Sequence, residues 1–271
     1  MKERYTGHDS QTAGVEEHRL VGGKGDGFLK SFTAGFLTTC GLGNVGTPCT
    51  DQGKSFGLHG TIGNTPADRA SWDMDRDRIV VRARISQEEI FAPKLVLDRT
   101  LECPLGENRI TVKDRIQNRG DVREACMILY HMNLGYPLLD EDARLFIPSR
   151  TVVPRNERAR EGIGEWNRME KPQKGFEEQC YYHEMEQGRA ELYQPKLRKG
   201  LRILYDPSVL PFFTQWKMMG WRDYVLGLEP GNCTADGRDR MRRDGCLKEL
   251  EPGETVEYAV TIEAYEEEVT G

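Results

Sequence analysis

A succession of short β-rich segments most constrains the fold of this chain. Between residues 78 and 134 the sequence contains IVVRARI, KLVLDRTLEC, RITVKDRIQN and EACMILYHMNL, separated by polar turns such as PLGEN and NRGD. Branched and aromatic residues favour strands, and closely spaced turns favour hairpins. The pattern resumes after residue 178 and ends in TVEYAVTIEA, where apolar residues alternate with polar or small ones. About a dozen strands and little helix predict an antiparallel all-β sandwich.

The domain organisation follows from the segments around these strands. Residues 1–27 are polar and glycine-rich, which predicts an irregular N-terminal segment, and no linker divides residues 28–271, which predicts a single domain. Residues 156–170 could form one substantial helix, although two glycines within them disfavour it. We expect residues 231–245, GNCTADGRDRMRRDG, to form a solvated loop, whose arginines could instead hold an anionic group.

Composition excludes several classes of protein. The net charge of -6 is spread along the chain without a basic block, so nucleic acid is not an expected partner. No apolar run is long enough for a membrane helix, and the first residues are too polar for a secretory signal, so we expect a cytoplasmic protein. The 7 cysteines form an odd set without a CxxC pair, which indicates reduced, packed thiols rather than disulfides or a zinc site.

Residues 128–139, ILYHMNLGYPLL, combine an apolar run with two polar side chains. Side chains alternate between the faces of a strand, so His131 and Asn133 would point to the same face. A strand that buries one face and presents an imidazole and an amide on the other is typical of the wall of a ligand pocket. For His131 alone, a core histidine satisfied by a backbone carbonyl is the alternative interpretation.

Glu229 stands at the end of another predicted strand, YVLGLEP. Pro230 cannot donate to a sheet ladder and ends this strand. Gly227 is the neighbour of Glu229 on the same face, and its missing side chain leaves room for a ligand beside the carboxylate. An edge-strand glutamate in solvent is the alternative.

Several other side chains are candidates for a binding site. His59 lies between two glycines in GLHGTIGNTPA, and their missing side chains would let a ligand approach closely. A loop histidine in water is the alternative. Trp216 offers a stacking face and Lys217 a hydrogen-bond donor, with core packing as the alternative for the tryptophan. His183 shares a face with Tyr181 and could line the same cleft, with a surface imidazole as the alternative. Asn64 and Asn232 are weaker candidates from the same segments.

Segments in this order are similar to those of aldose 1-epimerases (galactose mutarotases). The HG at His59 resembles their LHGG motif, and YHMNL after DRIQN resembles their strand pair that ends in a histidine before an aromatic-Asn-Leu stretch. LGLEPGNC resembles the segment that carries their essential glutamate, and LEPGETVEYAVTIEA resembles their closing turn and strand. TTCGL, LHGTIGNTPA, YHMNLGYPLL and QWKM resemble the DUF4432, or aldose 1-epimerase-like, branch. The similarity extends from about Phe28 to the end of the chain.

This resemblance implies a galactose-mutarotase-like antiparallel β-supersandwich, with a carbohydrate site in the concave face of the larger sheet. It implies that Glu229 is the general base for the anomeric hydroxyl, that His131 is the general acid for the ring oxygen, and that His59 holds substrate oxygens. The acid and the base would lie on opposite sides of one sugar. Ring opening, rotation about one bond and reclosure require no metal or cofactor.

Two departures from the family pattern affect the expected site. The family's substrate-binding aspartate has no clear counterpart, and Asp206 and Asp223 are both candidates. Members of this branch also usually carry further strands, including an arginine-bearing PDRG-type stretch, before the TTCGL segment, which this chain reaches by residue 38. The sandwich would then be smaller, be completed by a partner chain, or be recorded from an internal start.

Three functional hypotheses follow, in this order. The first is a sugar isomerase that interconverts anomers of a small-molecule sugar, with a homodimer compatible with the sequence. The second is a non-catalytic carbohydrate-binding protein on the same fold, since fold does not fix function. The third is a metal-dependent sugar isomerase or lyase with His59, His131, Glu229 and His183 as ligands, although no HxH or HxxE spacing supports it.

Overall fold

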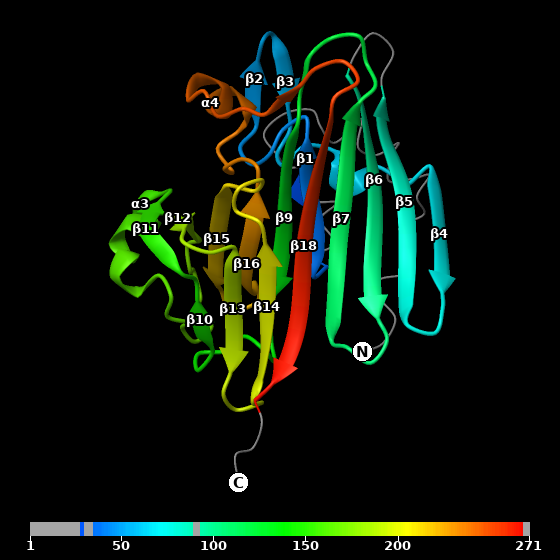
Figure 1. The fold of residues 1–271 in the computed structure, drawn as a ribbon. Helices are drawn as coiled ribbons and strands as arrows, with labels where there is room; N and C mark the ends of the chain where they lie inside the picture. The colour runs from blue at the N-terminus through cyan, green and yellow to red at the C-terminus, as the bar shows by residue number, and fades with distance from the viewer. Residues whose placement is uncertain (1–27, 30–34, 89–92, 268–271) are drawn as a thin grey trace.

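The computed structural model describes residues 28–29, 35–88 and 93–267, which form mainly antiparallel β-sheets (Figure 1). The predicted all-β class is therefore confirmed. The irregular segment expected at residues 1–27 lies outside the described residues. The 7 cysteines all lie within the described ranges and are free.

The smaller of the two main sheets has 6 strands and carries the candidate site residues His131, Glu229 and Trp216. Every pair of neighbouring strands in it is antiparallel. In spatial order the strands are β1 (Leu37–Leu42), β9 (Met127–Leu134), β16 (Tyr224–Gly231), β15 (Phe212–Met219), β12 (Gln179–Met185) and β11 (Ser149–Pro154).

The larger sheet has 8 strands and contains three of the four segments expected to form consecutive hairpins between residues 78 and 134, whereas the fourth segment forms β9 of the smaller sheet. The four strands that are consecutive between residues 69 and 118 are also neighbours in space. In spatial order the strands are β10 (Arg144–Phe146), β13 (Arg189–Gln194), β14 (Lys199–Tyr205), β18 (Thr255–Glu266), β7 (Arg109–Asn118), β6 (Lys94–Pro104), β5 (Arg78–Glu88) and β4 (Arg69–Met74).

Short elements connect the two sheets. Two-stranded pairs are formed by β2 (Cys49–Asp51) with β3 (Lys54–Phe56) and by β8 (Glu124–Ala125) with β17 (Glu249–Leu250). The helical segments of the described residues are η1 (Ile62–Asn64), α3 (Glu157–Glu161), η2 (Ile163–Glu165) and α4 (Arg238–Arg243).

Two of the predictions about irregular segments were wrong in detail. The helix expected over residues 156–170 is reduced to α3 and η2, because the chain leaves the α-helical path at Gly162. Asn156 caps α3 by accepting a hydrogen bond from the Ala159 amide. The expected solvated loop at residues 231–245 contains α4, and its residues Arg238 and Met241 are buried.

The hydrophobic core lies between the two main sheets and also contains a buried charge pair formed by Asp114 and Arg99. Ile128, Tyr130 and Met132 of β9 point into it, as alternation along a strand requires. Asp114 of β7 also points inward, where the guanidinium of Arg99 donates to both its oxygens at 2.8 and 2.6 Å and the Tyr130 hydroxyl donates at 2.8 Å. Asp114 is therefore buried on the core face of β7, because Arg99 neutralises its charge and Arg99 and Tyr130 donate hydrogen bonds to its oxygens.

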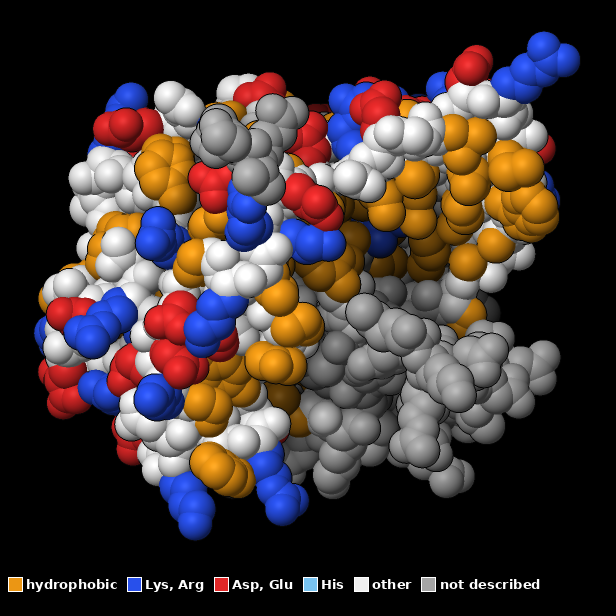
Figure 2. Space-filling model, turned by 90° about the horizontal axis from the view of Figure 1, so that it is seen from below, with side chains coloured by type: hydrophobic (Ala, Val, Ile, Leu, Met, Phe, Trp, Pro, Cys, Tyr) orange, Lys and Arg blue, Asp and Glu red, His pale blue; other side chains and the backbone are white. Residues whose placement is uncertain are grey.

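Apolar side chains remain exposed at one end of the larger sheet. Trp72 and Met74 of the edge strand β4 are 70% and 63% exposed, and Ile110 of β7 is 46% exposed. Figure 2 shows hydrophobic side chains gathered on the side where β4 to β7 lie. In Figure 1, β4 and β5 extend beyond β1, the edge strand of the smaller sheet.

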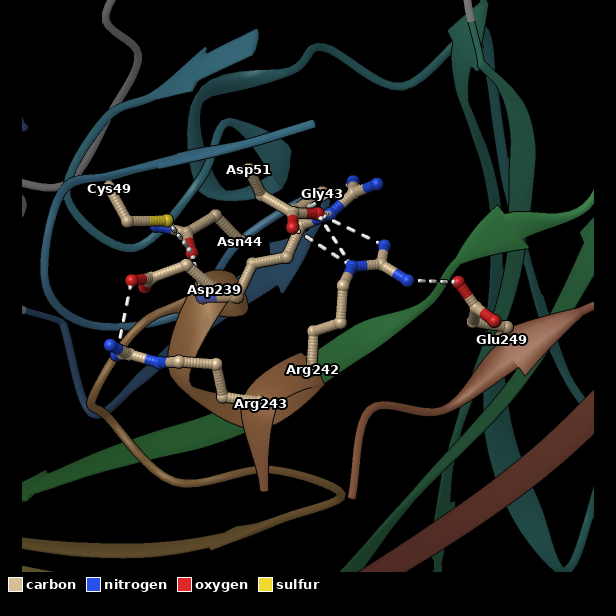
Figure 3. A network of polar contacts seen from close by, with 9 residues as sticks. Gly43, Asn44, Cys49, Asp51, Asp239, Arg242, Arg243 and Glu249 are labelled. Carbon is tan, nitrogen blue, oxygen red and sulfur yellow. Dashed lines mark hydrogen bonds and ion pairs between the residues drawn. The ribbon is translucent and has the colours of Figure 1, made fainter. Parts of the chain in front are cut away.

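A buried ionic cluster joins α4 to the β2–β3 hairpin (Figure 3). The Asp51 carboxylate accepts from Arg238 at 2.7 Å and from Arg242 at 2.9 to 3.1 Å, and Arg242 also donates to Glu249 at 2.8 Å. Asn44 accepts from the Arg238 amide and donates to the carbonyls of Thr47 and Gly57. The arginines of this segment thus bind an anionic group of the chain itself, and the cluster fixes the turn just before His59.

Replacing Asp51 by Asn should lower the free energy of unfolding by about 3 kcal/mol, because it leaves Arg238 buried without its counter-charge. Urea unfolding followed by circular dichroism measures this change. Asp239→Asn is the matched control: Asp239 pairs with Arg243, whose side chain is 66% exposed, and its loss should cost less than about 1 kcal/mol. Equal effects of the two substitutions would contradict a stabilising role for the buried cluster.

Candidate active site

The strand register brings His131 and Glu229 together. On β9 and β16, Leu134, Asn133 and Met132 lie opposite Leu226, Gly227 and Leu228. The same register places His131 opposite Glu229, and directly opposed residues of an antiparallel pair point to the same face. Because Met132 and Leu228 point into the core, His131 and Glu229 point to the outer face of the smaller sheet. The resemblance had implied the larger sheet, which is therefore corrected.

The imidazole and the carboxylate are in contact. His131 Nε2 lies 3.2 Å from Glu229 Oε1, and the two residues are only 7% and 2% exposed. A Cβ atom on Gly227 would lie 2.4 Å from Glu229 Oε1. The space that the sequence left beside Glu229 is thus occupied by its own carboxylate. The expected placement of acid and base on opposite sides of a sugar does not match this geometry, because the two groups are direct cross-strand neighbours.

Burial shifts the pKa values of this pair in opposite directions. It raises the pKa of the Glu229 carboxyl to about 8, an effect that the charge of Arg155 partly offsets. It lowers the pKa of His131 to about 4. Between these values the carboxyl is protonated and the imidazole is neutral, so the pair holds one titratable proton. Groups whose pKa values are driven apart in this way are suited to acid and base roles.

His59 is held against the same pair by backbone contacts. Its backbone has a positive φ of 59°, its amide donates to the Gly46 carbonyl at 3.0 Å, and its Nδ1 accepts from the Gly46 amide at 3.3 Å. Since Nδ1 is an acceptor, the ring proton resides on Nε2. The His59 and His131 ring centroids are 5.9 Å apart. Burial, followed by the charges of His131 and Arg155, lowers the pKa of His59 to about 3, so this imidazole is a neutral donor.

Trp216 lies against His131, and the charge of Arg155 acts on Glu229 and His59. The Trp216 ring lies edge-on to His131, with 5.7 Å between centroids, and its Nε1 donates to Glu178 at 2.6 Å. Arg155 donates to Asp236 at 2.9 Å and also to the Thr47 hydroxyl and the Ala235 carbonyl. This arginine therefore ties together the segments around the site. Its distant position in the sequence gave no signal of this role.

Lys217 and His183 lie on the opposite face of the sheet. Lys217 is opposite Leu226, and His183 is opposite Phe213, both of which belong to the core. The Lys217 ammonium contacts Glu170 at 3.3 Å, and His183 is held between Ser149 at 2.8 Å and Gln215 at 3.0 Å. The expectation that these two side chains line the same cleft as His131 is therefore corrected, because strand alternation separates them.

The three asparagines have different surroundings. Asn133 shares the face of His131 and donates to the Gly35 carbonyl at 3.1 Å. Asn64 lines a cavity of about 300 Å³ beside β1 whose lining includes neither His131 nor Glu229. Asn232 accepts from the Ile128 amide and donates to the Cys126 carbonyl and the Tyr258 hydroxyl, so its side chain supports the backbone. Only Asn133 thus lies beside the pair.

The two candidate aspartates lie in turns. Asp206 accepts from the Ser208 amide at 2.8 Å, and both Asp206 and Asp223 are exposed. Within the described ranges, no group of three or more His, Cys, Asp or Glu side chains is arranged to hold a metal ion. A separate finding is that no helix in the described part of the chain is both long and apolar enough to cross a membrane.

The comparisons with known proteins agree with this architecture. The family described as a domain of unknown function (DUF4432) matches residues 1–264. No curated protein matches the chain. Among solved structures, a "putative aldose 1-epimerase" from Klebsiella pneumoniae subsp. pneumoniae MGH 78578 has 28% sequence identity and a TM-score of 0.86, over 92% of this chain and 67% of that chain.

More distant structures share the fold. A galactose mutarotase-like protein from Clostridium acetobutylicum has 13% identity and a TM-score of 0.62, over 85% of this chain and 79% of that chain. A "putative aldose 1-epimerase" from Escherichia coli K12 has 14% identity and a TM-score of 0.56, over 86% of this chain and 82% of that chain. The chain therefore belongs to the DUF4432 family and has a galactose mutarotase-like fold.

Proposed function

We propose that the protein is a carbohydrate-active isomerase that interconverts the anomers of a free sugar. The observation that carries this proposal is the buried contact between Glu229 and His131, in which a carboxyl of raised pKa meets an imidazole of lowered pKa. His59 supplies a third polar group beside them. The names of the structural neighbours support the same class of activity.

The contact geometry suits the first step of anomer exchange. Moving the one titratable proton from Glu229 to His131 gives a carboxylate base and an imidazolium acid. The carboxylate takes the proton of the anomeric hydroxyl, and the imidazolium protonates the ring oxygen as its bond to the anomeric carbon breaks. Both sugar oxygens are bonded to that same carbon, so an acid and a base that lie side by side can reach both.

The remaining steps reverse the first. The open-chain aldehyde rotates about the bond between its first two carbons, and the ring closes on the other face of the carbonyl. Glu229 returns its proton to the carbonyl oxygen, and His131 recovers the proton of the attacking hydroxyl. His59 Nε2, the protonated nitrogen, donates a hydrogen bond to a sugar oxygen during these steps. Proton and bond changes then balance over one turnover.

NMR exchange spectroscopy between anomers tests this proposal directly. The panel contains D-glucose, D-galactose, D-mannose, D-xylose, L-arabinose, D-glucuronate and sulfoquinovose. We expect the wild-type protein to accelerate exchange of at least one sugar above its spontaneous rate. Absence of acceleration for every sugar would refute the proposal, and saturable binding without exchange would instead indicate a carbohydrate-binding protein.

The pH dependence of kcat/KM should be bell-shaped, because activity requires one proton on the pair. Below about pH 4 both groups are protonated and no base is present, and above about pH 8 neither carries the proton that the acid must give. The catalysed rate is measured from pH 3.5 to 9.5 after subtraction of the spontaneous rate. Activity that continues to rise above pH 9 would contradict the one-proton mechanism.

A further inference from the structure

The row that contains His131 and Glu229 continues across the smaller sheet. Thr214 of β15 lies directly opposite Glu229, and Tyr182 of β12 lies directly opposite Thr214. Opposed residues share a face, so His131, Glu229, Thr214 and Tyr182 form one polar row on the outer face. Neighbouring strands are about 4.8 Å apart, so the two hydroxyl residues are about one and two strand spacings from Glu229.

Both hydroxyl groups are buried, and neither makes a hydrogen bond of normal geometry within the described part of the chain. The Thr214 residue is 2% exposed, and its Oγ1 has no hydrogen-bond partner among the described residues. The Tyr182 hydroxyl oxygen is also buried; the Asp236 carboxylate lies near enough to interact with it, but the two groups do not meet in normal hydrogen-bond geometry. Each residue could form a hydrogen bond as donor or acceptor.

The position of these two hydroxyl groups, more than their burial, indicates a ligand, because the Tyr181 hydroxyl on the core side of the sheet is also buried without a partner among the described residues. A buried hydroxyl without a partner costs about 1 to 3 kcal/mol, and native structures contain few of them. Here two lie next to each other in the row that begins with the proposed acid and base. A ligand bound on this face would bring the missing partners, and sugar hydroxyls are suitable partners because they both donate and accept.

We propose that Thr214 and Tyr182 bind hydroxyl groups of the sugar, which lies along the row with its anomeric carbon at Glu229. This inference rests on the proposed function and adds the residues that determine specificity. Thr214 meets a ring hydroxyl close to the anomeric carbon, and Tyr182, which is farther away, meets a hydroxyl at the far end of the sugar. The site should therefore bind sugars that lack either hydroxyl more weakly.

Two substitutions each remove a single hydroxyl group: Tyr182→Phe and Thr214→Val. We expect each to raise KM for the panel sugars about 3- to 10-fold with kcat unchanged, as loss of a hydrogen bond present in both ground and transition states requires. The dissociation constant from saturation-transfer-difference NMR should rise by the same factor. Thr214→Val should not lower the free energy of unfolding, because the Thr214 hydroxyl has no hydrogen-bond partner among the described residues. Tyr182→Phe should lower it by less than about 1 kcal/mol, because the interaction of this hydroxyl with Asp236 lacks normal hydrogen-bond geometry.

Tyr181→Phe is the matched control. Tyr181 is the adjacent residue on β12, and its hydroxyl is also buried without a partner within the described residues, but it lies opposite Gln215 on the other face of the sheet. The chemical change is identical, so its effect on KM should be absent. Equal KM values for Tyr182→Phe, Thr214→Val and Tyr181→Phe would refute the inference while leaving the proposed activity intact.

Deoxy sugars identify the hydroxyl that each residue meets. The 2-, 3-, 4- and 6-deoxy forms of D-glucose and D-galactose are titrated against wild-type protein and both variants. One deoxy form should bind the wild-type protein more weakly than the parent sugar does. Tyr182→Phe should not lower the affinity for that form any further, because both changes remove the same hydrogen bond. Additive losses for every deoxy form would refute the assignment.

Binding and exchange are read separately, so the two proposals can fail separately. One outcome is that the wild-type protein binds a sugar without exchanging its anomers, and that Tyr182→Phe weakens this binding. This outcome supports the row as a sugar site and refutes the isomerase proposal. Absence of saturable binding of every panel sugar to wild-type protein refutes both.

Discussion

Replacing Glu229 by Gln is expected to lower kcat for anomer exchange by about 10²- to 10⁴-fold, the usual contribution of a general acid or base. The amide has nearly the shape of the carboxyl and keeps hydrogen-bonding groups beside His131, but it cannot take a proton from the anomeric hydroxyl. KM should change less than kcat, because proton transfer occurs in the transition state and not on binding. NMR exchange rates of the best panel sugar, recorded over a range of sugar concentrations, measure both.

The matched control for this prediction is Glu184→Gln. Glu184 lies on β12 of the same sheet and is exposed, so the same chemical change there should leave kcat unchanged. A Glu229→Gln variant with wild-type kcat would exclude Glu229 as the base. A variant that loses sugar binding altogether would indicate that the carboxyl serves mainly to hold the substrate.

The fold could be predicted from the sequence because its signals are local. Alternating apolar residues and short turns identify β5, β6, β7, β9 and β18 without any knowledge of their partners. The shortening of the helix after Asn156 and the presence of α4 were harder to predict from the sequence. The first depends on glycines within a short segment, and the second is stabilised by Asp51, which lies nearly 200 residues earlier in the sequence.

The site was only partly predictable because it depends on register between strands. His131 and Glu229 lie on strands that are almost 100 residues apart in sequence, and only their pairing places them 3.2 Å apart. Strand alternation does act locally. It shows that adjacent residues such as Trp216 and Lys217 cannot both face the same pocket, and the structure assigns the outer face to Trp216.

The hydroxyl residues of the row were missed for the same reason. Thr214 and Tyr182 carry no motif, and each becomes notable only when the register aligns it with Glu229. Within FFTQWKMM, alternation from Trp216 would have placed Thr214 on the same face. The absence of hydrogen-bond partners for the Thr214 hydroxyl among the described residues, however, depends on packing across the sheet and has no sequence signal.

The stability of the protein should depend on pH through the same carboxyl. The pKa of Glu229 is about 8 in the folded protein and near 4.5 in an unfolded chain. Its contribution to stability is therefore fully present below about pH 4.5 and is lost as the pH rises through 8. In between, the unfolded state releases a proton that the folded state keeps, so the free energy of unfolding falls by up to about 1.4 kcal/mol per pH unit.

Buried histidines act in the opposite direction at lower pH. Burial lowers the pKa values of His59, His131 and His183 to about 3, 4 and 4, from an ordinary value of 6.5. Between about pH 4 and 6.5 the unfolded state binds protons that the folded state does not, so stability rises with pH. The two effects oppose each other up to about pH 6.5, and above that pH the loss due to Glu229 remains.

Glu229→Gln should therefore remove a decline of about 2 kcal/mol in the free energy of unfolding between pH 6.5 and 8. Urea unfolding at both pH values, with wild type, Glu229→Gln and Glu184→Gln, measures the change for each protein. Taking the difference between proteins cancels the titration of other buried groups, including the thiols, whose pKa values burial raises. Parallel declines in all three proteins would show that the Glu229 carboxyl is ionised in the folded state, and the one-proton pair would then have to be abandoned. A decline confined to the two proteins that keep Glu229 would mean that the group proposed for catalysis destabilises the fold at the pH where its carboxylate form becomes available.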